Sequence, residues 1–126
     1  MTKTAFLFAG QGAQYLGMGR DLYDHYPIVK ETIDQASQVL GYDLRHLIDT
    51  EEDKLNQTRY TQPAILATSV SIYRLLQEKG YKPDMVAGLS LGEYSALVAS
   101  GALDFADAVA LVAKRGAYME EAAPAG

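Results

Sequence analysis

A serine flanked by glycines occurs at Gly88-Leu89-Ser90-Leu91-Gly92 and matches the pattern G-x-S-x-G. An apolar run at residues 84–89 leads into the serine, and a segment with helical composition follows it. In that context the pattern is typical of a nucleophilic serine on a sharp strand-to-helix turn. Glycine is favoured two residues to either side because larger side chains would collide as strand and helix close together. We predict that Ser90 is a nucleophile; the alternative is a serine in a structural turn.

An acyl group reacting at Ser90 would need hydrogen-bond donors for its oxyanion. The backbone N–H of Leu91, at the expected start of the helix, is one candidate. A second N–H should come from a loop that follows another strand. The loop at residues 9–19, AGQGAQYLGMG, follows the apolar run at residues 4–8, and its candidate donor is Gln11. The alternative for this segment is an ordinary loop.

The same loop has a superficial likeness to a dinucleotide-binding fingerprint. Gly10 and Gly12 fit that pattern, but Tyr15 stands where the third glycine belongs, and no helix clearly opens there. The loop also has no Walker lysine. Nucleotide binding is therefore disfavoured.

Arg115 lies on the apolar side of a helix expected at residues 103–123. It is spaced four residues from both Leu111 and Met119. A charge on such a face must be paired or must meet a ligand, and a guanidinium binds a carboxylate through two parallel hydrogen bonds. A buried ion pair, or an aliphatic stem with its charged end in water, would also explain the position.

The elements that would position these residues alternate between strand and helix. Strands are expected at residues 4–8 and 84–89, short helical turns within 45–58, and helices at 26–43, 61–81, 91–101 and 103–123. Thr61 and Asp104 are the expected N-caps of two of these helices. The alternation predicts an α/β fold with a parallel sheet. Only two strands are clear, which is few for a self-contained sheet.

Composition narrows the function classes. The chain has 126 residues, enough for one modest domain with a core, and a formal net charge of −5. That charge argues against a nucleic-acid partner. The absence of cysteine excludes disulfides and thiolate metal sites. No apolar run is long enough for a signal sequence or a membrane helix, so we expect a cytoplasmic protein without a membrane partner.

Several blocks of the sequence together resemble a known family. They are FLFAGQGAQYLGMG, TQPAILATSVSIYRLL, GLSLGEYSALVASGAL and KRGAYMEEAAP. In order and spacing they are similar to the malonyl-CoA:acyl carrier protein transacylases, relatives of the acyltransferase domains of polyketide synthases. The resemblance runs from residue 4 to the end. It implies that residues 1–126 are the N-terminal part of an α/β-hydrolase-like large subdomain, without the rest of its sheet and without the small ferredoxin-like subdomain.

The resemblance also implies a reaction, in fatty-acid biosynthesis. Ser90 would take malonyl from coenzyme A and pass it to the phosphopantetheine thiol of acyl carrier protein, in a ping-pong sequence. Gln11 and Leu91 would supply the oxyanion N–H groups. Coenzyme A enters as part of a substrate, so no cofactor and no metal are expected. The full-length protein would be a monomer, and a polyketide pathway stays open.

Three further roles follow from the same resemblance. Arg115 would clamp the free carboxylate of malonyl, Met119 would line the acyl pocket beside it, and Gln62 would lie near the floor of the site. One position departs from the family, which often has histidine just before the serine where this chain has Leu89. That change affects the lining of the pocket and leaves the nucleophile in place.

The general base is not evident in this sequence. The only histidines, His25 and His46, precede Ser90 and read as residues at helix boundaries. In the family the catalytic histidine lies well downstream. We therefore expect the isolated 126 residues to be inactive or nearly so. The alternatives are a serine esterase or hydrolase, and a non-catalytic fragment that docks carrier proteins.

Overall fold

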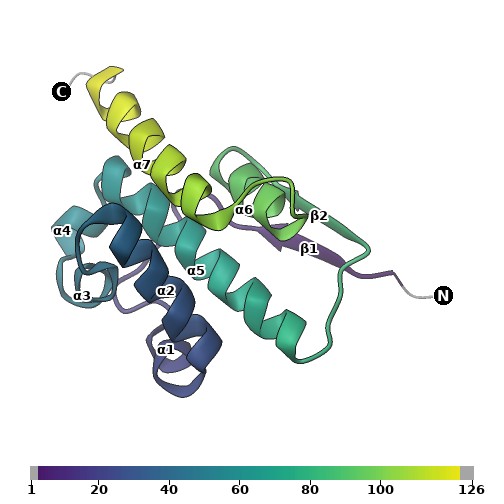
Figure 1. The fold of residues 1–126 in the computed structure, drawn as a ribbon. Coiled ribbons are helices and arrows are strands. Elements are labelled where there is room, and N and C mark those ends of the chain that lie inside the picture. The colour runs from purple at the N-terminus through teal and green to yellow at the C-terminus, as the bar shows by residue number, and fades with distance from the viewer. Residues whose placement is uncertain (1–2, 123–126) are drawn as a thin grey trace.

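The structure is a computed structural model that describes residues 3–122. These residues form an α/β fold with one parallel sheet (Figure 1). In chain order the elements are β1 (Ala5–Phe8), α1 (Arg20–His25), α2 (Pro27–Leu40), α3 (Leu44–Thr50), α4 (Glu52–Leu55), α5 (Thr58–Glu78), β2 (Met85–Gly88), α6 (Leu91–Ala99) and α7 (Phe105–Ala122). The α/β prediction is confirmed, and both predicted strands are present.

The two strands pair in parallel, with Ala5 opposite Met85 and Phe8 opposite Gly88. Parallel pairing requires a crossover, and α1 to α5 supply it. Helix α6 packs against both strands, as the ribbon shows (Figure 1). Leu7 remains 82% exposed, although parallel sheets are usually covered on both faces.

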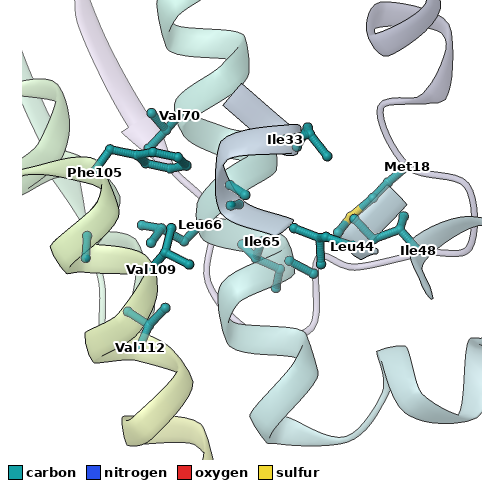
Figure 2. Packing of buried hydrophobic residues seen from close by; sticks show 14 of the residues in the cluster. Met18, Ile33, Leu44, Ile48, Ile65, Leu66, Val70, Phe105, Val109 and Val112 are labelled. Atoms are coloured by element: carbon teal, nitrogen blue, oxygen red, sulfur yellow. The ribbon is translucent and has the colours of Figure 1, made fainter. Parts of the chain in front are cut away.

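Helix α5 is the centre of the packing and contacts α2, α6 and α7 (Figure 1). Its buried Leu66 and Val70 meet the buried side chains of Phe105, Val109 and Val112 from α7 (Figure 2). The α5–α7 contact therefore supplies much of the core. It also fixes the relation between Gln62 on α5 and Arg115 on α7.

The predicted start of α5 was wrong. The helix begins at Thr58 with Gln57 as its N-cap, so Thr61 lies inside the first turns. The Thr61 hydroxyl lies within hydrogen-bond distance of Leu55 O and, at 2.9 Å, of Gln57 O four residues earlier in the chain. Bonding back to the carbonyl four residues earlier is a common arrangement for threonine within a helix. Pro63 consequently lies inside the helix rather than in its first turn.

The helix ends that Pro27, Gly41 and Asp104 indicate agree with the prediction, whereas helix α1 was not predicted. Helix α2 starts at Pro27 and ends before Gly41, whose φ of 81° is the left-handed conformation expected at a helix C-terminus. Asp104 caps α7, and its carboxylate accepts the N–H of Asp107 at 3.2 Å. Within residues 3–122, no helix combines the length and apolar character needed to span a membrane.

The apolar face predicted for α7 was only partly right. Phe105, Ala108, Val109, Val112 and Gly116 form the buried face. Leu111 and Met119 lie to one side and are 45% and 40% exposed. Arg115 is half-buried between the two regions, at the edge of the α5 contact.

Candidate active site

Ser90 lies at the turn between β2 and α6 with φ 56° and ψ −114°. Among the described residues it is the one non-glycine residue with positive φ. Such a backbone conformation costs about 1–3 kcal/mol and persists only where surrounding structure enforces it. The strained turn predicted from G-x-S-x-G is therefore present, with the strand before it and the helix after it.

The two glycines of the pattern are required by close backbone contacts. A Cβ on Gly88 would lie 2.1 Å from the carbonyl carbon and oxygen of Gly92. A Cβ on Gly92 would lie 2.4 Å from the carbonyl oxygen of Phe8, at the end of β1. Glycine thus allows α6 to start directly against both strands. This contact holds the serine at the carboxyl edge of the sheet, where ligands of open α/β sheets bind.

The two proposed oxyanion donors lie beside this turn. Gly92 N–H donates to Leu89 O at 3.0 Å, and a Cβ on Gly10 would lie 3.3 Å from that same oxygen. The loop at residues 9–19, here called the glycine-rich loop, therefore abuts the turn. Within residues 3–122, neither Leu91 N–H nor Gln11 N–H donates to a protein acceptor. Both are available for the role that the sequence assigns to them, which stays a prediction.

Arg115 reaches Ser90 from α7. Its Nη2 donates to Ser90 Oγ at 3.0 Å, and its Nη1 donates to Gln62 Oε1 at 2.6 Å. The guanidinium also lies 5.5 Å from the centroid of the Tyr94 ring. Throughout the described part of the chain, no carboxylate pairs with Arg115. The ion-pair alternative is thus absent from this structure, and the guanidinium retains capacity for an external carboxylate.

Gln62 links Arg115 to the glycine-rich loop. It is 1% exposed, and its Nε2 donates to Gln11 Oε1 at 3.2 Å and to Met119 Sδ at 3.7 Å. The structure therefore brings Gln11, Gln62, Ser90, Arg115 and Met119 into one connected group. Gln62 is thus buried and bonded to Arg115, and its expected place near the floor of the site stays a prediction.

Sequence reasoning missed residues that support this group. Thr58 Oγ1 accepts a hydrogen bond from Gln11 Nε2 at 3.2 Å. A Cβ on Gly116 would lie 2.7 Å from both Arg59 Cα and Thr58 O, so glycine permits the close approach of α7 to α5 next to Arg115. A glycine inside an otherwise apolar helix was the one available signal for Gly116. Nothing in the sequence singled out Thr58.

An ion pair joins the same two helices. Glu120 Oε2 accepts from Arg59 Nε at 2.6 Å, and Glu120 Oε1 accepts from the backbone N–H of Arg59 at 2.8 Å. The backbone N–H, followed by the guanidinium, lowers the pKa of the Glu120 carboxyl. The carboxylate in turn raises the pKa of Arg59.

The far end of the glycine-rich loop is anchored by a buried arginine. Arg45 is 5% exposed, and its Nη2 donates to Met18 O at 2.7 Å and to Asp49 Oδ1 at 2.6 Å. Asp49 also accepts from Arg20 Nη1 at 2.7 Å. Burial alone would raise the pKa of Asp49, but hydrogen bonds from Arg45 and Arg20 outweigh it and lower the pKa. The loop that carries Gln11 is therefore held at both ends.

Neither histidine bonds to Ser90. His25 Nδ1 lies 2.7 Å from Asp21 O in α1, and His46 Nε2 lies 3.2 Å from Thr50 Oγ1 in α3. Both helices lie away from the β2–α6 junction (Figure 1). Among residues 3–122, no cluster of three acidic or histidine side chains is arranged for a metal ion.

An apolar groove runs along α7 beside Arg115. It is open to solvent, measures about 500 Å³ and is lined by residues of α7 alone, among them Leu111, Arg115, Tyr118 and Met119. A hollow of about 570 Å³ lies between the glycine-rich loop and α5, with Met18 and Ile65 in its wall, and does not include Ser90. Ser90 therefore lines neither hollow, and of the two only the one along α7 includes Arg115.

Comparison with known proteins places this geometry in a family. Curated relatives include the malonyl CoA-acyl carrier protein transacylases of Escherichia coli (strain K12), 55% identical over 128 residues, and of Bacillus subtilis (strain 168), 50% identical over 127 residues. The matches cover 100% of this chain but only 41% and 40% of those relatives.

Solved structures show the same relation. A crystal structure of MCAT from Streptococcus pneumoniae has 94% identity and a TM-score of 0.95, with coverage of 97% of this chain and 40% of that one. A complex of a type II PKS acyl-carrier protein with its malonyl-transacylase has 51% identity and a TM-score of 0.95, covering 99% of this chain and 41% of that one. The family model described as acyl transferase domain matches residues 5–126. Because that family model matches residues 5–126, which is nearly the whole chain, the chain belongs to the acyl transferase domain family.

Proposed function

We propose that the full-length protein transfers malonyl from coenzyme A to the phosphopantetheine thiol of acyl carrier protein, with Ser90 as the carrier of the acyl group. The observation that carries this proposal is the contact between Arg115 Nη2 and Ser90 Oγ at 3.0 Å, made by an arginine with no carboxylate partner within residues 3–122. The similarity to malonyl CoA-acyl carrier protein transacylases supports the same substrate and acceptor.

The reaction has two balanced halves. Ser90 Oγ attacks the thioester carbonyl, the C–S bond breaks, and coenzyme A leaves as its thiol with the proton from the serine. The phosphopantetheine thiol then attacks the malonyl ester, the bond from carbon to Oγ breaks, and the proton returns to the serine. In each half the Leu91 and Gln11 N–H groups would stabilise the oxyanion.

Arg115 would select the acyl group. The malonyl carboxylate would take the guanidinium hydrogens that now point to Ser90 Oγ, while Nη1 stays on Gln62. Charge-assisted bonds to a guanidinium are stronger than neutral ones. An acetyl group offers no such partner, so the enzyme should prefer the dicarboxylic acyl group.

The general base is proposed to be a histidine outside these 126 residues, because His25 and His46 make hydrogen bonds within α1 and α3. We further propose a cytoplasmic, monomeric protein of fatty-acid synthesis, without cofactor or metal and without nucleic-acid or membrane partners. The isolated chain should then acylate slowly or not at all.

The test is a transfer assay with labelled malonyl-CoA and a holo acyl carrier protein. The full-length protein should form a labelled ester that Ser90→Ala abolishes, and should pass the label to the carrier. The isolated chain serves as a parallel sample and should show little turnover. Release of the label as free malonate, whether or not carrier is present, would indicate a hydrolase instead. Carrier binding without acylation of the full-length protein would indicate a docking function.

A further inference from the structure

The first turn of α5 lacks a side-chain cap of its own. Gln57 is the N-cap residue, and its side chain makes no capping hydrogen bond. Helix N-termini leave backbone N–H groups without intrahelical partners. Here the Arg59 N–H is satisfied by Glu120 Oε1 at 2.8 Å, from α7. A carboxylate at this position also interacts favourably with the helix dipole. The cap of α5 is therefore supplied by a residue distant in sequence.

Glu120 binds Arg59 a second time, through Oε2 and Nε at 2.6 Å. The two bonds, to backbone and guanidinium of one residue, fix both the distance and the direction of the carboxylate. One turn earlier on α7, Gly116 touches the same stretch of α5, where a Cβ would clash with Thr58 O and Arg59 Cα at 2.7 Å. Glu120 and Gly116 together set the register of α7 on the end of α5.

That register decides which site atoms meet. Arg115 directly precedes Gly116, and Gln62 lies one turn after Arg59. The bond from Arg115 Nη1 to Gln62 Oε1, at 2.6 Å, spans the two helices at this point. A slip of one residue along a helix moves a side chain by about 1.5 Å, which exceeds the tolerance of a hydrogen bond.

We propose that the Arg59–Glu120 pair is a positioning element. By fixing the register of α7 on α5, it holds the Arg115 guanidinium where it can bind the carboxylate of the acyl group. This inference rests on the proposed function, and it adds residues that do not touch the substrate. Glu120 acts through the end of α5, and Arg115 is the residue through which the effect reaches Ser90.

Kinetics of the full-length protein test this proposal with malonyl-CoA and acetyl-CoA as donors. Misplacing a catalytic group by about 1 Å can cost up to about 10²-fold in rate. We therefore expect Glu120→Ala to lower kcat/KM for malonyl transfer about tenfold and to change acetyl transfer less than about twofold. Glu120→Gln keeps an oxygen for the Arg59 N–H and should fall between wild type and Glu120→Ala. Glu121→Ala, next in the same helix and exposed, is the matched control and should leave both donors unchanged.

A double-mutant cycle separates positioning from simple stabilisation. If Glu120 acts through Arg115, adding Glu120→Ala to Arg115→Ala should cause no further loss of malonyl transfer. Equal losses on both donors, or a full additional loss in the Arg115→Ala background, would overturn the proposal. If the alanine variant does not fold, the same comparison with Glu120→Gln decides. Absence of malonyl transfer by the wild-type protein would instead refute the proposed function. The Ser90→Ala and Arg115→Ala variants test that function separately from the role of Glu120.

Discussion

Arg115 on α7 donates a hydrogen bond of 3.0 Å to the hydroxyl of Ser90 on the β2–α6 turn. The two residues are separated by 25 positions in sequence, and they meet because α6 and α7 both pack against α5. A serine hydroxyl and a guanidinium without a carboxylate partner in residues 3–122, at this distance, would suit an acyl group that carries its own carboxylate.

Arg115→Ala should reduce malonyl transfer by about 10²-fold or more while leaving acetyl transfer nearly unchanged. The loss corresponds to about 3 kcal/mol for a hydrogen bond to a charged group. Arg115→Lys should recover only part of it, because an ammonium lacks the forked geometry. Steady-state kcat/KM with the two donors measures both effects. Equal losses with malonyl and acetyl would contradict a role for Arg115 in carboxylate recognition.

Gln62→Glu should weaken malonyl transfer by raising KM. The new carboxylate would stand 2.6 Å from Arg115 Nη1, at the place of Gln62 Oε1, and would neutralise the guanidinium before substrate arrives. Gln62→Met, of similar size and uncharged, is the matched control and should cost less. Measurement of KM for malonyl-CoA distinguishes them. A KM no higher in Gln62→Glu than in Gln62→Met would show that Arg115 does not hold the acyl carboxylate.

Gly92→Ala should destabilise the fold by about 3 kcal/mol, since overpacking at a fixed contact typically costs about 1–3 kcal/mol. Its Cβ would lie 2.4 Å from Phe8 O, and backbone atoms on both sides leave little room to relax. Gly10→Ala, whose Cβ would lie 3.3 Å from Leu89 O, is the milder comparison. Urea unfolding of both variants gives the difference. Equal stability of the two would mean that the turn adjusts easily.

Asp49→Asn should lower the free energy of unfolding at neutral pH. It should also make that free energy fall less steeply as the pH is lowered. The pKa of Asp49 is lowered in the folded protein. Its contribution is therefore present above the pKa of the unfolded chain, about 3.9, and is lost as pH falls through the folded pKa. Removing the charge leaves Arg45, 5% exposed, without its partner, at a cost of about 3 kcal/mol.

Urea unfolding of wild type and Asp49→Asn between pH 3 and 7 measures this effect, and the two curves should converge at low pH. Asp53→Asn, an exposed carboxylate on α4, is the control and should leave the profile unchanged. Parallel curves for wild type and Asp49→Asn would show that the anchoring pair does not contribute to the acid sensitivity.

Ser95→Ala should leave stability unchanged or raise it by about 1 kcal/mol. Ser95 is 0% exposed, and its hydroxyl has no hydrogen-bond partner among the described residues. An unsatisfied buried hydroxyl is unfavourable, and its removal costs little packing. Thermal unfolding of the variant checks this. A loss of more than about 1 kcal/mol would reveal a partner for the hydroxyl in solution.

Much of this protein could be inferred from local sequence. The G-x-S-x-G spacing and its flanking composition were enough to predict the strained turn at Ser90, because collisions between neighbouring residues allow few conformations there. Pro27, Gly41 and Asp104 marked the ends of helices for the same reason, since each acts on its own backbone. Thr61 was wrongly predicted as the N-cap of α5. A threonine whose hydroxyl bonds back to a helix carbonyl cannot be told from a capping threonine in the sequence alone.

The meeting of the site residues required the tertiary structure. Sequence spacing placed Arg115 on an apolar face, but an ion pair within the chain explained that position equally well. The packing of α7 on α5 turns the guanidinium toward Ser90 and Gln62, and among the described residues it leaves the guanidinium without a carboxylate partner. The roles of Thr58 and the Arg59–Glu120 pair were likewise hidden, because contacts across 47 and 61 positions leave no local periodicity. Steric constraints between neighbouring residues can be inferred from the local sequence. The direction of a long charged side chain depends instead on which elements of the fold pack around it.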